Sequence, residues 1–509
     1  MKTMKKLPLL VGIVVTSLWL PSLAAYGNVG LDNQPLHWDV RESFSDSQSG
    51  ANIEAKIGGK VTEIICDEFG KRKLATYPVG ASCDPSAYSG RVFVGFPSLQ
   101  VPVCEGAGKN CIEEFFAVDP SGKKLEGQFL GYTTLSGWVP ENKQLGNHLG
   151  AASGIWKIAG AIHSGGSDFY EVHLTMEGGF VEFRNGRQLG KFKQEDRSFN
   201  SAIRPISVAI EDGVYKKAVC GDCSALPAEL IFGVTAVLPK SIKSWYSGRI
   251  IEPDVIYEPA SSGFNRITIT GKPMTIPTFQ GRISKSQASP ELLSLYDWCP
   301  TDWHYCPGWH TNGYSYGNDQ SSKYLRAWRP LANDSATGQS TTWTIRTVTV
   351  FFGRGSGGDL GFSRCAEPNK PAGIVSTNAL IYDGMVPQFQ NGFFNYRVAG
   401  MHYKADGKTE FLGRYEMVMD EQLARCMFRF PKAPISATVT VTGENGENVV
   451  ATSLVNSSNG KLRLAAYNFT FSEKTIKIKL GAQWHITCTK GKTTRYVKGT
   501  RCPAGFKRG

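Results

Sequence analysis

The chain has 509 residues, of which 41% are hydrophobic and 20% are charged, a composition that is typical of globular proteins and excludes extensive disorder. Its 56 glycines are scattered without a collagen-like period, so they indicate turns between short apolar stretches. The formal charge of +12 suits an anionic partner surface, such as a cell-wall polymer, an acidic polysaccharide or lipid headgroups.

Residues 1–24 have the features of a secretory signal peptide. Lys2, Lys5 and Lys6 precede an apolar run over residues 7–20, and Ser22 and Ala24 supply small residues for cleavage. The run is too short for a good transmembrane span, although a retained N-terminal anchor is the alternative. Without these three lysines the mature chain carries +9. We expect it to be secreted, or retained at the cell surface without a transmembrane segment, and not to meet nucleic acid.

An alternating pattern over residues 171–182 predicts a half-buried strand, which the tight-turn pair Asn185-Gly186 follows. The alternation places two sets of side chains on opposite faces: Val172, Leu174 and Met176 against Glu171, His173 and Thr175.

Two motifs in the first half of the chain contain residue types that enzymes use in catalysis. The segment His163–Asp168 joins a base, hydroxyls and a carboxylate, but a glycine-rich turn explains it without chemistry. Cys220-Gly221-Asp222-Cys223 has the spacing of a redox dithiol, yet no βαβ pattern surrounds it and a structural disulfide is the preferred interpretation. The common hydrolase, metalloprotease and nucleotide-binding motifs are missing. We therefore predict no catalytic residue, metal ligand or cofactor.

The most unusual segment is Tyr296–Trp328, which follows a short helix that Ser289-Pro290-Glu291 is expected to open. It combines aromatic residues with cysteines and histidines. Aromatic faces on a disulfide-closed loop suit sugar rings or the hot spot of a protein partner. A loop that buries its own tryptophans and a metal site at His304 and His310 are the alternatives. The predicted ligand-binding residues are Trp298, Trp303, His304, Tyr305, Trp309, Tyr314 and Tyr316.

The second half of the chain shows strands between turn signals. Residues 341–352 form a β-branched and aromatic run, and residues 395–401 and 410–419 flank the turn Ala405-Asp406-Gly407, which predicts a hairpin. Residues 438–442, 461–464 and 475–480 alternate between loops that contain Asn-Gly pairs, and residues 420–426 predict one helical turn.

The C-terminal tail is basic and contains no acidic residue from residue 484 to residue 509. A disulfide would hold it as a small hairpin that displays its charge on a fixed surface. A solvated basic terminus without a partner is the alternative. The residues predicted to bind an anionic surface are Lys490, Lys492, Arg495, Lys498, Arg501, Lys507 and Arg508.

All twelve cysteines follow the signal peptide, and an even number in a secreted chain favours disulfides. Proximity in the sequence predicts the pairs Cys66–Cys83, Cys104–Cys111, Cys220–Cys223, Cys299–Cys306, Cys365–Cys426 and Cys488–Cys502.

The strands and turns together predict a mainly β, multi-domain β-sandwich protein with few short helices, stapled by disulfides. The length is enough for two to four domains. We expect an N-terminal β domain over 25–225, a middle β region over 226–360 with the Cys/Trp-rich loop at 296–328, a C-terminal β-sandwich over 361–482, and the basic tail over 483–509.

The ending over residues 486–507, with its Cys-Pro-Ala-Gly-Phe-Lys run, is the most distinctive of several segments, which also include residues 110–113, 238–249, 342–344, 424–426, 436–442 and 468–471. In these segments the chain resembles large secreted proteins of unassigned function from actinobacteria. The resemblance implies an exported or surface location and a β-rich C-terminal half. It implies no catalytic residue.

These features predict a secreted or cell-surface adhesion protein that binds a glycan, a cell-wall polymer or a surface protein. A secreted hydrolase of glycan or peptide and a structural envelope component without a small ligand are the alternatives. A cleft lined by acids or histidines would favour the hydrolase, and an exposed tryptophan platform would favour the binding protein.

Overall fold

The structure is a computed structural model and is mainly β, as the sequence predicts, with three short α-helices in its described part. The residues that it describes are 36–40, 50–57, 60–67, 84–106, 109–133, 153–194, 199–218, 225–240, 242, 245–296, 313–314, 320–348, 365, 367, 370–384, 387–390, 393–428, 435–443, 446–449, 451–482, 485–491, 493–498 and 501–508.

Nine strands in the first two thirds of the chain pair in a closed cycle, which we call the N-terminal ring. Each strand is antiparallel to its neighbours. The order of pairing is β5 (Cys111–Val118), β6 (Lys124–Tyr132), β7 (Gly154–Ile158), β8 (Phe169–Arg184), β10 (Phe199–Pro205), β17 (Gly338–Val348), β14 (Trp245–Pro259), β15 (Phe264–Ile283) and β13 (Ile231–Pro239), which returns to β5.

Alternating side chains fill the inside of the N-terminal ring. Val172, Leu174 and Met176 of β8 point into this core, as their period of two predicts, and pack with residues such as Phe232 and Trp343. The opposite face of β8 is buried as well, although its residues are polar: Glu171, His173 and Thr175.

The pairing between β13 and β5 joins residue 231 to residue 118. Hydrogen bonding of the N-terminal ring therefore crosses the expected domain boundary near residue 225. The strand predicted over 341–352 begins three residues earlier as β17, and its last four residues lie outside the described part of the chain.

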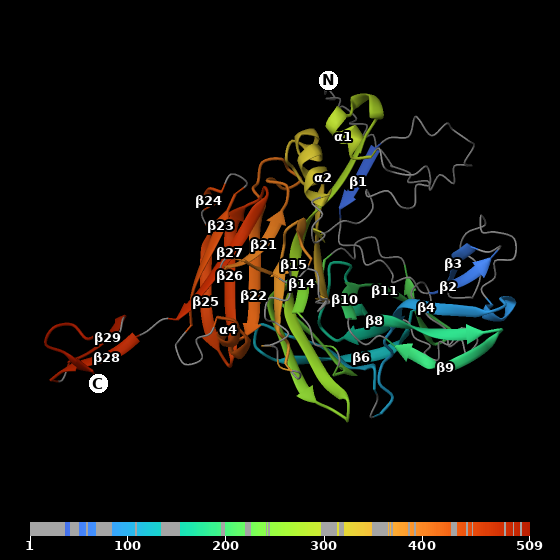
Figure 1. Cartoon of the computed structure of the whole chain (residues 1–509), viewed down its shortest axis with the longest axis horizontal. Coiled ribbons are helices and arrows are strands. Elements are labelled where there is room, and N and C mark those ends of the chain that lie inside the picture. The colour runs from blue at the N-terminus through green and yellow to red at the C-terminus, as the bar shows by residue number, and fades with distance from the viewer. Residues whose placement is uncertain are drawn as a thin grey trace, which may run out of the picture.

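The outer half of β8 carries further strands at the edge of the molecule (Figure 1). Asn185 and Gly186 both have positive φ, as the tight turn between β8 and β9 requires. The strands at this edge are β4 (Arg91–Gln100), β9 (Arg187–Gln194), β2 (Gly50–Ile57) and β3 (Lys60–Asp67), and a separate hairpin pairs β11 (Ser207–Glu211) with β12 (Val214–Ala218).

The C-terminal part of the chain forms the predicted β-sandwich, whose two sheets enclose a second core that includes Tyr396, Met417 and Ile478. One sheet has the order β18 (Gly373–Thr377), β22 (Leu412–Asp420), β26 (Lys461–Thr470) and β25 (Thr452–Ser458). The other has the order β16 (Gly313–Tyr314), β19 (Ile381–Asp383), β21 (Phe393–Ala399), β27 (Lys474–Ala482), β23 (Ile435–Thr442) and β24 (Asn448–Val449), with β20 (Gln388–Gln390) on β21.

Among the described strands, the parallel pairing of β14 with β18 joins the N-terminal ring to the C-terminal sandwich. Trp245 to Gly248 of β14 pair with Gly373 to Ser376 of β18. The sandwich also contains α4 (Glu421–Phe428), which begins one residue after the start of the helical turn predicted over 420–426.

The hairpin predicted around Ala405-Asp406-Gly407 is wrong as a strand pair. A tight turn does form there, with Lys404 N–H donating to Thr409 O at 2.8 Å. However, β21 pairs with β27 and β22 pairs with β26, in different sheets. The connection crosses from one layer of the sandwich to the other.

Helices α1 (Pro290–Ser294) and α2 (Gln320–Trp328) lie with β1 (Leu36–Val40) over the end of β15 (Figure 1). The predicted capping of α1 is confirmed, because the Ser289 hydroxyl accepts from Leu292 N–H. Short 3₁₀ turns occur at Pro85–Ala87, Lys285–Gln287 and Pro330–Ala332.

Three of the predicted disulfides are present: Cys104–Cys111, Cys365–Cys426 and Cys488–Cys502. The predicted pairs Cys66–Cys83, Cys220–Cys223 and Cys299–Cys306 involve cysteines whose side chains lie outside the described part of the chain.

Candidate binding sites

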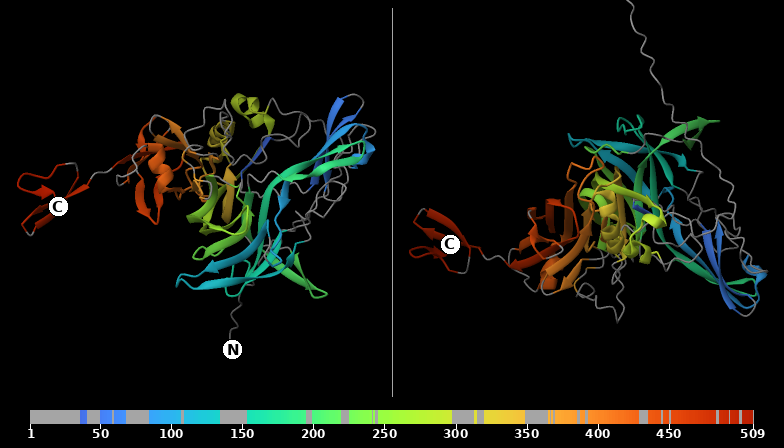
Figure 2. Two further views of the ribbon diagram at one scale, coloured as in Figure 1. Left: turned by 60° about the horizontal axis from the view of Figure 1, so that its bottom comes forward. Right: turned by 90° about the horizontal axis from the view of Figure 1, so that it is seen from above.

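The C-terminal residues fold as a small three-stranded unit, which we call the C-terminal hairpin. It consists of β28 (His485–Lys490), β29 (Thr493–Lys498) and β30 (Lys507–Arg508), all antiparallel. Cys488 is fully buried and bonds Cys502, so the strands and the turn after them are tied together. The hairpin stands clear of the rest of the molecule in the views of Figures 1 and 2.

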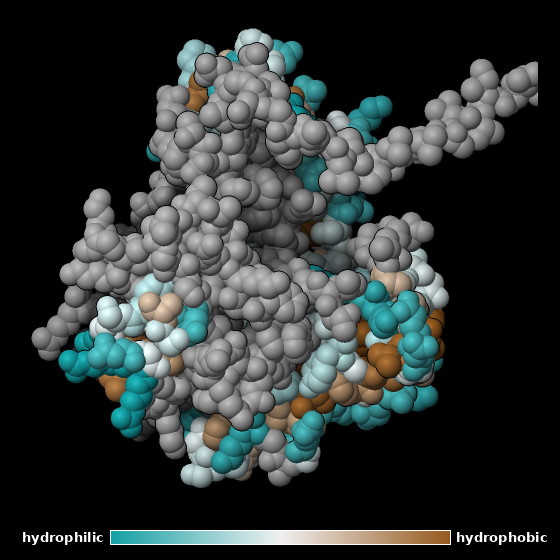
Figure 3. Space-filling model, turned by 90° about the vertical axis from the view of Figure 1, so that its right-hand side faces the viewer, coloured by the Kyte–Doolittle hydropathy of each residue, from teal (hydrophilic) through white to brown (hydrophobic). Residues whose placement is uncertain are grey.

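Four cations of the C-terminal hairpin are exposed to solvent. Lys490, Arg495, Arg501 and Lys507 are exposed. The Arg495 guanidinium lies 5.1 Å from the centroid of the Phe506 ring, a cation–π contact that orients it. Lys498 and Arg508 lie in β29 and β30, and Lys492 lies outside the described residues. On the side of the molecule that faces away from this hairpin, the described surface mixes polar and apolar residues (Figure 3).

The aromatic segment is described only at its two ends and at β16. Six of the predicted ligand-binding residues lie outside the described part of the chain: Trp298, Trp303, His304, Tyr305, Trp309 and Tyr316. The seventh, Tyr314, belongs to β16, which runs parallel to β19 at the edge of the sandwich.

The described ends of this segment pack inside the protein. Tyr324 and Trp328 of α2 are buried with Trp38 and Phe279. The Tyr324 hydroxyl donates to Leu295 O at 2.5 Å, and the ring is 6.2 Å from that of Trp38. Tyr324 and Trp328 are therefore part of a core. Ligand binding stays a prediction for the residues from Trp298 to Tyr316.

The glycine-rich turn at His163 is built for structure. Gly165 N–H donates to His163 Nδ1 at 3.0 Å, which places the ring proton on Nε2. Nε2 then faces Ile206 O at 3.1 Å and the Ser167 hydroxyl at 2.8 Å. A nitrogen that carries a proton cannot remove one from Ser167, so this pair is not a nucleophile and its base.

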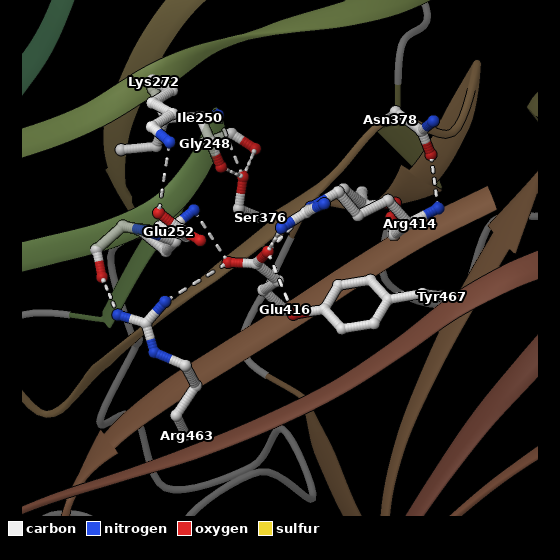
Figure 4. A network of polar contacts seen from close by, with 12 residues as sticks. Gly248, Ile250, Glu252, Lys272, Ser376, Asn378, Arg414, Glu416, Arg463 and Tyr467 are labelled. Atoms are coloured by element: carbon white, nitrogen blue, oxygen red, sulfur yellow. Dashed lines mark hydrogen bonds and ion pairs between the residues drawn. The ribbon is translucent and has the colours of Figure 1, made fainter. Parts of the chain in front are cut away.

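A buried carboxylate lies where the N-terminal ring meets the C-terminal sandwich (Figure 4). Glu416 of β22 is completely buried, and Arg414 and Arg463 both contact it. One of its oxygens also accepts from Glu252 N–H at 2.9 Å, at the bulge where β14 bends and Glu252 has a φ of 54°.

Tyr467 is a further member of this network, and its pKa reflects the buried, charged surroundings. Its hydroxyl lies 3.3 Å from Glu416, and its ring lies under the Arg414 guanidinium. Burial, and secondarily the charge of Glu416, raises the pKa of Tyr467 to about 12. Two guanidinium groups compensate the charge of the buried carboxylate, and the contacts of Glu416 join β14 to β22 and β26.

A cavity of about 260 Å³ opens beside this network, which we call the junction cavity. Four separate segments line it: residues 254–257 of β14, residues 370, 371, 373 and 374 at the start of β18, residues 418–420 at the end of β22, and residues 459–461 in the turn before β26. The sequence does not indicate this site, because each segment by itself has only the ordinary pattern of a strand end or a turn.

Charged groups surround the apolar interior of the junction cavity. The Lys461 ammonium contacts the Asp254 carboxylate, and the Lys370 ammonium lies 3.0 Å from Glu367. Glu367 and the nearby Asp420 both raise the pKa of Lys370, and the hydrogen bond that Lys370 donates to Glu367 is the larger cause. Ile374 and Val418 are buried at the back of the cavity, whereas Ile256 is exposed.

Neither a metal centre nor a membrane helix is found in the described ranges. There, no group of three or more His, Cys, Asp or Glu side chains is placed to hold a metal ion. Likewise, no helix among those residues has the length and apolarity of a membrane span. A scan against protein-family models and a search of curated proteins found no match to the sequence.

Proposed function

We propose that this is a secreted or cell-surface adhesion protein that binds an anionic glycan or cell-wall polymer through the C-terminal hairpin. The observation that carries this proposal is the exposed set of cations on a disulfide-closed unit whose sequence contains no acid from residue 484 onward. The signal-peptide pattern of residues 1–24 and the disulfides support an exported location.

The rigidity of the hairpin is what makes its charge useful for binding. Three paired strands and Cys488–Cys502 hold the cations at fixed spacings, so less side-chain and backbone freedom is lost when they meet a polymer. Acidic residues elsewhere contribute little, since exposed charges are screened beyond about 8 Å at physiological salt. A repeating anionic polymer can therefore contact several cations at once.

Two buried titratable groups, His163 and Glu416, are held in structural contacts. The His163 ring contacts Gly165 N–H, Ile206 O and the Ser167 hydroxyl, and two arginines contact Glu416. Neither group has the environment of a general acid or base.

The test neutralises three exposed cations of the hairpin in the full-length protein, as Lys490→Gln, Arg501→Gln and Lys507→Gln together. Each exposed contact is worth about 0.2–1 kcal/mol, so the triple variant should bind isolated anionic cell walls about tenfold more weakly. The measurement is the wall-bound fraction against protein concentration at low salt.

The matched control removes the same charge elsewhere, as Lys285→Gln, Lys404→Gln and Lys408→Gln, all at exposed positions. Both triple variants have the same net charge, so only the place of the change differs. Wild-type binding by the control supports the proposal. Equal weakening of both variants would show that net charge alone attracts the wall, and unchanged binding by both would refute a role for the hairpin.

A further inference from the structure

The junction cavity is distant from the C-terminal hairpin and different in chemistry. Its lining contains two cations and two anions, Lys370, Lys461, Asp254 and Asp420, so its charges balance. The hairpin attracts anions. The lining carries no net charge of its own. Both of its lysines already contact carboxylates, Lys461 that of Asp254 and Lys370 that of Glu367, which lies outside the lining.

Such a lining suits a ligand with groups that both donate and accept hydrogen bonds. A hydroxyl donates to the carboxylates of Asp254 or Asp420 and accepts from the ammonium of Lys461. It can do so without separating an existing ion pair. An ionic ligand would have to compete with the pair partner, at a cost in desolvation.

The polar groups of the junction cavity are held in place by their own elements. Asp420 Oδ1 accepts from Leu423 N–H at 2.8 Å at the start of α4. Asn459 and Gly460 both have positive φ, which fixes the tight turn that carries Lys461. Asp254 follows the bulge of β14 that Glu416 holds. A ligand therefore meets a preformed set of donors and acceptors.

Apolar side chains form the remaining wall. Ile256 is 44% exposed, a large fraction for an isoleucine that lines a cavity, and Pro371 lies on the opposite segment. The volume of about 260 Å³ lies just below the range of drug-sized pockets, so it fits a single ring better than a larger ligand.

We infer that the junction cavity binds one neutral, hydroxyl-rich ring, such as a single sugar residue of a glycan. The C–H face of the ring would lie on Ile256 and Pro371, and its hydroxyls would meet Asp254, Asp420 and Lys461. This inference rests on the cavity alone and holds whether or not the C-terminal hairpin binds a polymer.

The test uses ligand-observed NMR on the full-length protein, with methyl glycosides of glucose, galactose, mannose and N-acetylglucosamine as probes. Ile256→Trp places an indole in the mouth of the cavity at an exposed position. It should weaken binding of the preferred glycoside about tenfold or more, or 1.4 kcal/mol for each tenfold. Ile210→Trp makes the same change at an exposed isoleucine of β11, outside the cavity, and should bind as wild type does.

Lys461→Gln is the second variant and keeps a donor while it removes the charge. It should weaken glycoside binding and leave the melting temperature nearly unchanged, because the Lys461–Asp254 pair is partly exposed. Glycine and inorganic phosphate are the ionic probes and should not bind the cavity. The hairpin variant with three glutamines should bind glycosides normally.

Three results would overturn the inference: no glycoside bound by the wild-type protein, equal binding by Ile256→Trp and wild type, or glycine or phosphate bound in the cavity in place of a glycoside. A loss of wall binding in the hairpin variant with glycoside binding intact would separate the two sites.

Discussion

His163 shows how the surroundings of one residue set its protonation. Burial lowers the pKa of its imidazole below the usual 6.5, against the weaker opposing effect of the Ile206 carbonyl. The unfolded chain therefore binds a proton at a higher pH than the folded protein does. The stability that the neutral ring contributes is complete above about pH 6.5 and decreases as the pH falls below that value.

His163→Gln tests this account, because a glutamine side chain can also accept from Gly165 and donate to Ile206 but does not titrate. Melting temperatures of the variant should change less than those of the wild type between pH 7 and pH 5. Parallel pH profiles for the two proteins would mean that His163 is not a source of acid sensitivity.

Single residues also show the limit of the sequence analysis. Tyr324 and Trp328 belong to the aromatic segment but not to its predicted ligand-binding residues, and they are buried against Trp38 and Phe279. A sequence shows that an indole or phenol ring is present but not which way it points. The direction depends on α2 packing over β15, which involves residues more than forty positions apart.

At the scale of elements, local chemistry predicted much of the structure correctly. The pairs Asn185-Gly186 and Asn459-Gly460 form tight turns, and Ser289 caps α1. Alternating residues at 438–442, 461–464 and 475–480 lie in β23, β26 and β27. Backbone preferences and side-chain periodicity act within a few residues, so one sequence is enough to show them.

The connection over residues 400–411 could not be predicted in this way. Met401 is buried in the core beside α2, whereas Phe411 is buried in the core of the C-terminal sandwich. The turn at Asp406 is local and was found, but the pairing of its flanking strands depends on which core buries each side chain.

The disulfides allow a quantitative prediction at the same scale. Cys365–Cys426 closes a separation of 61 residues and Cys104–Cys111 closes one of 7. Each disulfide stabilises the folded protein by restricting the unfolded chain. This contribution to the free energy of unfolding is about 4 kcal/mol for Cys365–Cys426 and about 2 kcal/mol for Cys104–Cys111.

Replacing Cys365 and Cys426 by alanine should therefore lower the free energy of unfolding more than replacing Cys104 and Cys111 does. Urea denaturation of the two double variants under non-reducing conditions measures the difference. A larger loss for the Cys104–Cys111 variant would mean that local packing, and not loop closure, determines what each disulfide contributes.

At the scale of the whole molecule, the strand content follows from the sequence but the pairing does not. The N-terminal ring closes through β5 and β13, which are more than a hundred residues apart, and β14 joins β18 across a similar distance. Each closure depends on many weak packing preferences at once. The junction cavity arises from the second of these pairings, which is why no motif pointed to it.

The exposure of Lys490, Arg495, Arg501 and Lys507 in the C-terminal hairpin, by contrast, was predictable from the sequence, because among the described residues no distant segment covers them. Cys488–Cys502 was predicted from proximity alone and is present. The molecule thus combines a β-rich body with a charged unit that stands apart from it, and this unit is central to the proposed function.

The most direct test of that function is the release of wall-bound protein by sodium chloride, measured for the full-length chain and for a chain that ends before Trp484. The account predicts that full-length protein binds isolated walls at low salt and elutes as salt is raised, because each contact is electrostatic and screened. The shortened chain should remain in solution throughout. Equal wall binding by the two chains at low salt, or binding of the full-length chain that salt does not release, would contradict it.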